Sequence, residues 1–268
     1  MAIRPFLIPS YIKSQQKEAE FFLMDVESIR TRIQRFSGAD PEVTIIIPAF
    51  NEEATILRCL SSLSMTKTSQ KIEVLVVNNN STDRTQQVVE SVGVKCIMEH
   101  VQGVKHARTT ALHNAKSNII LSADADSIYS PYWVDMLSLP LRNSEVACTY
   151  GRFAFIPEKA YKRFFYFLYE TMGDFYKNVL QIDKDKAMYV YGCSSGYRKN
   201  QAISVNGYEH PVGANEDGYL ALKLRNKYGA LCKVTTNKSL VWTSNRQLLQ
   251  QGGLLSSLKK RVKHYLNI

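Results

Sequence analysis

The chain has 268 residues, of which 45% are hydrophobic and 22% charged, and these proportions exclude an intrinsically disordered protein. No run approaches the roughly 18 apolar residues of a membrane-spanning helix, and the first twenty residues lack the features of a secretory signal. We therefore expect a cytoplasmic protein. The five cysteines are odd in number and widely spaced, which predicts reduced thiols rather than a disulfide framework or a zinc site.

The formal net charge of +10 is concentrated at one end of the chain. No acidic residue follows Asp217, whereas ten lysines and arginines do, and these account for the whole surplus. A local cationic face for diphosphates, anionic lipid head groups or an acidic acceptor fits this distribution better than nucleic-acid binding. A solvated basic helix is the alternative.

The first 121 residues show a regular succession of helical and strand patterns. Residues 14–36 carry apolar side chains at alternating spacings of four and three, which predicts one amphipathic helix packed on the body or a partner. The β-branched runs at 43–47 and 72–77 predict buried strands, with a helix over 52–64 between them. We expect helices at 83–91 and 103–115 and strands at 94–98 and 119–121.

This alternation predicts an α/β fold with a mostly parallel central sheet and helices on both faces, because parallel strands require crossover connections. Ligands of such sheets bind beyond the carboxyl ends of the strands. Three polar loops qualify there, at 48–52, 78–83 and 122–126.

The pattern is less regular after about residue 145. We expect a long aromatic helix over 158–180, which could pack in the core or offer a stacking wall for a sugar or lipid. A Gly-rich turn is expected at 192–196, a helix at 215–228 and a short strand at 240–242. The tail places Leu254, Leu255, Leu258, Val262, Tyr265 and Leu266 on one side of a helix, which could lie on an anionic membrane or cap the sheet.

Two acidic motifs could carry chemistry. Asp124 and Asp126 follow an apolar strand, and two carboxylates at that edge suit a hard divalent cation that bridges phosphates, although an isolated pair could equally cap a helix. Glu216 and Asp217 begin a predicted helix, where acidic residues also complement the helix dipole.

Five segments occur in one order along the chain: residues 47–53, 76–83, 103–108, 124–126 and 215–220. Together they resemble family 2 glycosyltransferases with the nucleotide-sugar-binding A-type fold, a Rossmann-like architecture, and the resemblance spans about residues 43–246. The resemblance implies a nucleotide-sugar-binding half (43–140) and an irregular acceptor-binding and catalytic half of the same domain (141–246). The residue patterns on either side predict a helical extension (1–42) and a basic amphipathic C-terminal helix (247–268).

The resemblance also implies roles for individual residues. The nucleotide-binding set would be Pro48, Ala49, Phe50, Glu52, Asn78, Arg108, Asp124, Ala125 and Arg246. Within it Arg108 would sit over the base, Asp124 would face the ribose and the metal, and Arg246 would neutralise the leaving diphosphate. Asp126 would bind Mn²⁺ or Mg²⁺ and the diphosphate. Asn78 stands where relatives commonly have an aspartate that accepts the uracil N3 proton, which leaves the base open.

The implied activity is inverting transfer from a nucleotide diphosphate sugar, with UDP favoured, to a glycan or lipid-linked acceptor. Asp217 would be the general base and Glu216 would bind the acceptor or the donor sugar. We expect the protein in the cytoplasm, with peripheral contact at the inner face of the membrane through the C-terminal helix. We expect no nucleic-acid partner. A sugar nucleotidyltransferase is disfavoured because no Gly- and Arg-rich loop follows the first strand. A non-catalytic binding module would lack a carboxylate in one cluster, and a dinucleotide oxidoreductase would carry G-x-G-x-x-G.

Overall fold

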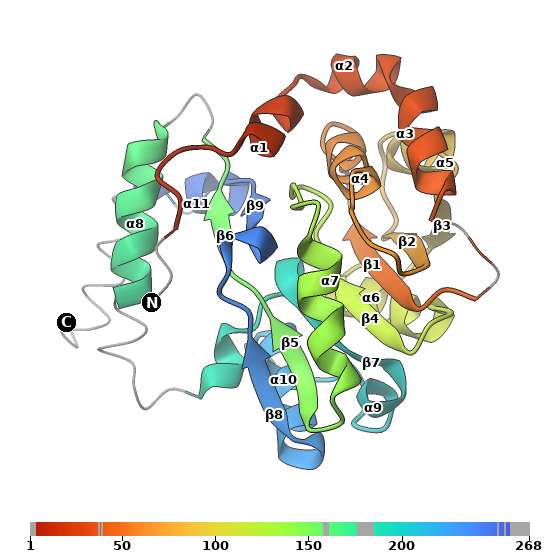
Figure 1. The fold of residues 1–268 in the computed structure, drawn as a ribbon, viewed down its shortest axis with the longest axis vertical. Coiled ribbons are helices and arrows are strands. Elements are labelled where there is room, and N and C mark those ends of the chain that lie inside the picture. The colour runs from red at the N-terminus through yellow and green to blue at the C-terminus, as the bar shows by residue number, and fades with distance from the viewer. Residues whose placement is uncertain are drawn as a thin grey trace.

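The fold comes from a computed structural model, which describes residues 4–36, 38, 40–157, 161–175, 185–250, 252–254 and 256–257 (Figure 1). Within them a seven-stranded sheet has the order β3-β2-β1-β4-β7-β5-β8. The strands are β1 (Val43–Ala49), β2 (Ile72–Asn78), β3 (Lys95–Met98), β4 (Ile119–Ser122), β5 (Val146–Tyr150), β7 (Ser195–Arg198) and β8 (Ala230–Lys233). All neighbouring pairs are parallel except those of β7, which runs antiparallel to β4 and β5. The predicted mostly parallel α/β sheet is confirmed.

Helices cover both faces of this sheet because its strands are apolar on both sides. One face is covered by α3 (Val26–Gln34), α4 (Ile56–Ser64), α5 (Thr85–Ser91) and α7 (Trp133–Ser138). The other is covered by α6 (Val104–Asn114), α9 (Lys199–Ile203) and α10 (Glu216–Tyr228). Alternate residues of β1 therefore belong to different cores, with Ile45 and Ile47 on the first face and Ile46 on the second.

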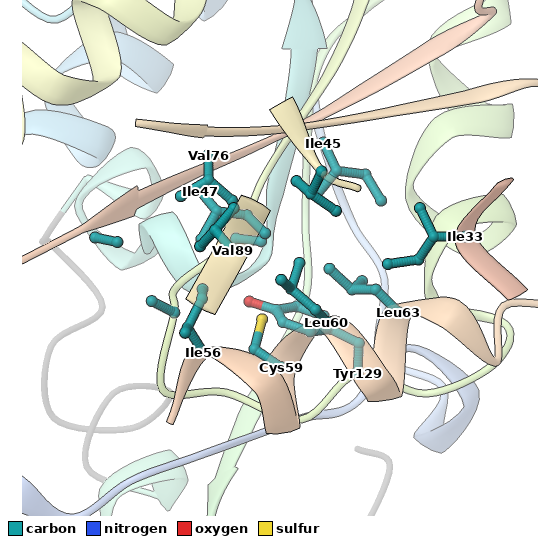
Figure 2. Packing of buried hydrophobic residues seen from close by; sticks show 14 of the residues in the cluster. Ile33, Ile45, Ile47, Ile56, Cys59, Leu60, Leu63, Val76, Val89 and Tyr129 are labelled. Carbon is teal, nitrogen blue, oxygen red and sulfur yellow. The ribbon is translucent and has the colours of Figure 1, made fainter. Parts of the chain in front are cut away.

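The first face shows how closely the core is packed. Ile45 and Ile47 of β1 belong to one buried cluster with Leu60 and Leu63 of α4 (Figure 2). Leu60 is fully buried, so truncating it to alanine would cost about 2–5 kcal/mol of stability. This packing fixes the end of β1, from which the first loop of the site extends.

The helical N-terminus differs from the single helix expected over 14–36, which was wrong. Three helices form: α1 (Ser10–Gln15), α2 (Ala19–Met24) and α3. The backbone leaves helical geometry at Gln16 (φ −84°, ψ 58°) and Asp25 (φ −99°, ψ 9°), so that the apolar side chains can follow the curved surface of the body. The predicted burial of the apolar stripe holds for Phe22, Ile29 and Ile33.

Strand β7 corrects the Gly-rich turn expected at 192–196. Only Gly192–Ser194 forms a 3₁₀ turn, and the chain then enters the middle of the sheet. A Cβ on Gly196 would lie 2.6 Å from Leu121 Cδ2, so glycine at this position allows the neighbouring strands to pack closely. Glycine here serves close strand packing, which a local pattern cannot distinguish from a turn.

The chain beyond β5 adds a smaller layer next to the main sheet. Strands β6 (Phe153–Phe155) and β9 (Val241–Thr243) pair in parallel. Beside them lie α8 (Arg163–Phe175), at one edge of the molecule, and the short α11 (Arg246–Gln250) (Figure 1). Further 3₁₀ turns occur at Leu139–Arg142, Lys186–Tyr189 and Asn237–Ser239.

The C-terminal part and the division into functional halves are only partly covered. The predicted basic helix over 247–268 extends beyond the described residues, since everything after Ser257 lies outside them. Both proposed halves share the main sheet through the β4–β7 pairing, and their separate functions stay a prediction. Within the described part of the chain, no helix combines the length and apolarity needed to cross a bilayer.

Candidate active site

A cleft of about 1330 Å³ opens beyond the carboxyl ends of β1 and β4. Its walls come from four regions: the loop after β1, the start of α6, the loop after β4, and the C-terminal half. They include Pro48, Ala49, Phe50, Glu52, Asn79, Gly103, Arg108, Asp124, Ala125, Asp126, Gly192, Glu216, Asp217, Ser244 and Arg246. Apart from Asn78, every predicted site residue borders this one cleft. The volume exceeds that of a typical small-ligand pocket, so two substrates could be held together.

Hydrogen bonds to the loop that follows β2 fix the conformation of the loop that follows β1. Asn51 adopts a left-handed conformation (φ 53°), which asparagine tolerates better than most residues. Its backbone N–H donates to Ser81 Oγ at 2.9 Å, and its Oδ1 accepts from the Thr82 N–H at 2.8 Å. Phe50 is left 45% exposed and presents a flat apolar ring to the cleft.

Asn78 does not face the cleft. It is buried, its Oδ1 accepts a hydrogen bond from the Ser81 N–H at 3.0 Å, and its amide donates to Gln86. The neighbouring Asn79 lines the cleft instead, and its Oδ1 accepts from the Gly103 N–H at 2.7 Å. Asn78 is held in the turn that begins at its own position, away from the lining of the cleft, and its contact with a base stays a prediction.

Asp126 is surrounded by donors from the C-terminal half. Thr243 Oγ1 and Arg246 Nη2 each lie 3.3 Å from its carboxylate, and the Ser244 hydroxyl also donates to it. Arg246 donates to Glu52 as well, so one arginine spans the first loop and the acidic motif after β4. The predicted role of Arg246 as a cation beside the diphosphate is compatible with this position.

Arg108 is the buried centre of the site. Its Nη2 donates to Asp124 Oδ1 at 3.1 Å, and its Nη1 donates to Glu216 Oε1 at 2.8 Å and to Asp217 Oδ2 at 2.5 Å. The side chain is only 4% exposed, so these bonds act in a low-dielectric setting. The resemblance implied a position over the base, whereas the hydrogen bonds of the guanidinium in the described structure run to carboxylates.

Asp217 stands at the first turn of α10. The Asn215 side chain caps that helix by accepting from the Asp217 N–H at 3.2 Å. Oδ2 of Asp217 bonds to Arg108, and the Gly192 backbone is close enough to the carboxylate to lower its pKa. Oδ1 is buried without a hydrogen bond of normal geometry among the described residues. An unsatisfied buried carboxylate oxygen in a cleft is a candidate acceptor for a substrate proton.

Burial perturbs the acidic groups of the cleft. Desolvation raises the pKa of Asp217, with a further increase from Glu216, while Arg108 lowers it. Desolvation likewise raises the pKa of Asp124 to about 7, opposed by Arg108 and assisted by Asp126 and Asp217. The Asp124 side chain is 36% exposed, but the dense packing of protein atoms around it still desolvates the carboxylate and raises its pKa. Carboxylates with raised pKa values are typical of functional sites.

A divalent cation would be compatible with this donor set. No group of three or more His, Cys, Asp or Glu side chains is arranged for a metal among the described residues. Asp124 and Asp126 nevertheless both border the cleft. One or two carboxylates completed by substrate phosphates are the ligand set that Mg²⁺ usually takes.

Several site residues escaped the sequence analysis. Tyr129 accepts from the Asp124 N–H at 2.7 Å and donates to the Cys193 carbonyl, so it fixes the backbone of the acidic motif. The rings of Phe153, Phe155, Tyr169 and Tyr191 line another part of the cleft. Only the aromatic enrichment of the predicted helix pointed toward such a wall.

The comparison with protein families decides the classification. The model of glycosyl transferase family 2 matches residues 44–203. The chain belongs to this family. Glycosyltransferase GlyA of Streptococcus pneumoniae is 24% identical over 198 residues, which cover 69% of this chain and 28% of GlyA.

A second relative and a solved structure extend the comparison. WfgD of Escherichia coli, a UDP-Glc:alpha-D-GlcNAc-diphosphoundecaprenol beta-1,3-glucosyltransferase, is 33% identical over 119 residues, covering 42% of this chain and 46% of WfgD. The chain therefore spans less than half the length of both curated relatives. Glucosyl-3-phosphoglycerate synthase of Mycobacterium tuberculosis, in complex with Mn²⁺, UDP-glucose and phosphoglyceric acid, has 17% identity and a TM-score of 0.57, covering 92% of this chain and 84% of the synthase. At that identity the similarity shows the fold.

Proposed function

We propose that this family 2 glycosyltransferase transfers a sugar from a UDP-sugar to a hydroxyl of a glycan or lipid-linked acceptor. The transfer inverts the configuration of the anomeric carbon. One observation carries the proposal: a single cleft joins Asp124 and Asp126 to Glu216 and Asp217, and Arg108 forms ion pairs with members of both pairs. A donor site and a proton acceptor are thereby held next to each other.

The donor would bind between the first loop and the acidic motif. Asp124 and Asp126 would hold a divalent cation, which would neutralise the diphosphate and stabilise it as a leaving group. Phe50 would pack against the nucleoside, and Arg246 would exchange its bond with Asp126 for the phosphates. This change of partner requires only a movement of the Arg246 side chain, because that side chain is 46% exposed.

Asp217 would act as the general base. As the acceptor oxygen bonds to the anomeric carbon, the bond from that carbon to the diphosphate breaks and the hydroxyl proton passes to the Asp217 carboxylate. A single displacement leaves the sugar with inverted configuration and releases UDP. Because Asp217 is only 6% exposed, an acceptor bound beside it would be shielded from water.

The nucleoside is proposed from the relatives, since Asn78 does not reach the cleft. WfgD is named for a UDP-sugar, and the synthase of similar fold is in complex with UDP-glucose. Asn79 borders the cleft, although Glu99 and Val101 carbonyls already accept from its amide nitrogen. Backbone groups of the first loop would therefore take part in recognising the base.

Calorimetry with UDP, GDP, dTDP and CDP, each with and without Mn²⁺, tests the donor assignment. We expect UDP to bind most tightly and to require the cation. Tighter binding of another nucleotide would reject the uridine assignment alone, whereas the absence of binding by all four would contradict the proposed donor site. Family membership disfavours the sugar nucleotidyltransferase, and the intact carboxylate pairs disfavour a non-catalytic module.

A further inference from the structure

The outward face of α8 is apolar, which is unusual for a helix at the edge of a protein. Its exposed large side chains are Phe164 (48%), Phe165 (51%), Leu168 (43%), Met172 (54%) and Phe175 (59%). The spacing 164, 168, 172 and 175 places four of them along one stripe. Surface helices normally present polar residues to water, so this stripe indicates a surface that meets an apolar partner.

The N-terminal segment enlarges the same surface. The Phe6 ring lies 6.3 Å from Phe164 and 5.6 Å from Phe167, both edge to face. Phe6 is 51% exposed and Leu7 is 77% exposed. We call Phe6, Leu7, Phe164, Phe165, Leu168, Met172 and Phe175 the α8 patch.

The acidic residues of α8 are neutralised by ion pairs. Glu170 is buried in a two-bond pair with Arg163, both bonds 2.8 Å long, and Asp174 pairs with Arg4 at 3.0 Å. Lys162 is exposed immediately before the helix. The α8 patch therefore has no unneutralised carboxylate from its own helix that would repel an anionic surface.

Positive charge follows in the sequence directly after the last contact that the described chain makes with this helix. The Ser257 hydroxyl lies 3.1 Å from the Tyr169 hydroxyl on the inner side of α8. Lys259, Lys260, Arg261 and Lys263 follow within six residues. Exposed aromatic side chains, combined with a basic cluster a few residues further along the chain, match the interface of an anionic bilayer.

The inner face of the same helix borders the cleft, which Tyr169 lines together with Leu248 and Ser257. We propose that the α8 patch docks on the surface of an anionic lipid bilayer and so holds the cleft next to membrane-embedded acceptors. Docking follows from the patch and the charges alone. The orientation toward a lipid-linked acceptor rests on the proposed function.

Vesicle co-sedimentation of the full chain tests the docking, with phosphatidylcholine alone and with added phosphatidylserine. We expect binding only to the mixed vesicles, weakening with salt because the charges are screened. The variant Phe164→Gln/Leu168→Gln/Met172→Gln should bind at least about tenfold more weakly, since three partly inserted side chains are lost. The substituted side chains are exposed, so folding should persist, and denaturant unfolding checks it.

The matched control is Leu23→Gln/Met24→Gln on α2, which changes two apolar side chains that are 48% and 82% exposed outside the α8 patch. Its vesicle binding should equal that of the wild type. Removing residues 258–268 should also weaken binding to mixed vesicles, while leaving the buried Leu254 and the Ser257–Tyr169 contact in place.

Any of four results would overturn the proposal. The wild type and the triple variant could bind vesicles equally, or the wild type could fail to bind them. The truncated chain could bind more tightly, which would identify the tail as the cover of the patch. Light scattering that finds a wild-type dimer dissociated by the triple substitution, without vesicle binding, would assign the patch to a second copy. UDP calorimetry on the same proteins separates a failure of docking from a failure of the donor site.

Discussion

Arg108 Nη1 donates to Asp217 Oδ2 at 2.5 Å, while the other terminal nitrogen of the same guanidinium donates to Asp124 at 3.1 Å. One buried cation thus connects the acidic motif after β4 with the start of α10, 109 residues after Arg108 along the chain. The planar fork of an arginine can hold two carboxylates in fixed directions, which a lysine cannot do. Arg108 is therefore a positioning residue between the proposed donor site and the proposed base.

Replacing Arg108 with alanine should destabilise the protein by about 3 kcal/mol or more, because buried Asp217 would lose its counter-ion. Arg108→Lys should recover part of the stability but little of the transfer activity. Urea unfolding and donor turnover measure the two effects. The matched control is Arg142→Ala, which breaks an exposed pair with Glu42 and should change stability by less than about 0.5 kcal/mol. Equal losses in both alanine variants would contradict the central role of Arg108.

Gly192 leaves the space that Arg108 occupies. A Cβ built on Gly192 would lie 1.8 Å from Arg108 Nη2, so Gly192→Ala should displace the guanidinium. We expect a stability loss of about 1–3 kcal/mol from overpacking, together with slower transfer. Gly38→Ala is the control, since its Cβ would meet only the flexible Lys71 side chain, at 3.2 Å. Full activity in Gly192→Ala would show that the position of Arg108 is not critical.

Asp126→Ala should abolish the strengthening of UDP binding by Mn²⁺. Without the cation, the phosphate charges and the carboxylates of the cleft repel one another. Calorimetric titration with and without Mn²⁺ gives the comparison, and Glu42→Ala, at an exposed carboxylate outside the lining of the cleft, is the control. The metal assignment is wrong if Mn²⁺ tightens UDP binding to Asp126→Ala as much as to the wild type.

The sequence predicted the first half of the fold well because its strands are uniform apolar runs separated by amphipathic helices. It did not predict β7, whose Ser195-Gly196 start has little strand character and is held by its neighbours β4 and β5. Local pattern also could not show which side of α8 is buried, because Tyr166 and Phe165 are equally compatible with a core. Tertiary contacts decide such positions.

The sequence predicted many of the residues that border the cleft, but it did not predict how their side chains are oriented. The order of the motifs led to the residues of the cleft, including Asp124, Asp126 and Asp217. The orientation of Asn78 depends on a turn whose hydrogen bonds cannot be read from composition. The contacts of Arg108 join segments that lie far apart in the chain, and no local spacing encodes them.

The pH dependence of transfer should report the desolvated carboxylates of the cleft, Asp217 and Asp124. A general base must be ionised, and burial raises the pKa of the Asp217 carboxyl above its ordinary value of 3.8. We therefore expect kcat/KM to fall as the pH decreases through that raised pKa, with an acid limb at higher pH than an ordinary aspartate would give. Because Arg108 lowers the same pKa, Arg108→Lys should leave the limb near its wild-type position if the charge stays close, and Arg108→Ala should move it to higher pH. A profile that stays flat down to the ordinary aspartate pKa of 3.8 would exclude Asp217 as the base.

Asp217→Asn tests the proposed chemistry directly. The amide keeps the shape of the side chain and removes the proton acceptor, so transfer should fall by about 10²- to 10⁴-fold, the range for loss of a general base. UDP affinity in Mn²⁺ should barely change, because Asp124 and Asp126 remain. Glu216→Gln is the comparison: it also removes a carboxylate bonded to Arg108 but leaves the base, so its effect should be smaller. NMR coupling constants of the wild-type product should show inverted anomeric configuration. Retention of that configuration, or near-normal turnover by Asp217→Asn, would reject a single displacement assisted by this residue.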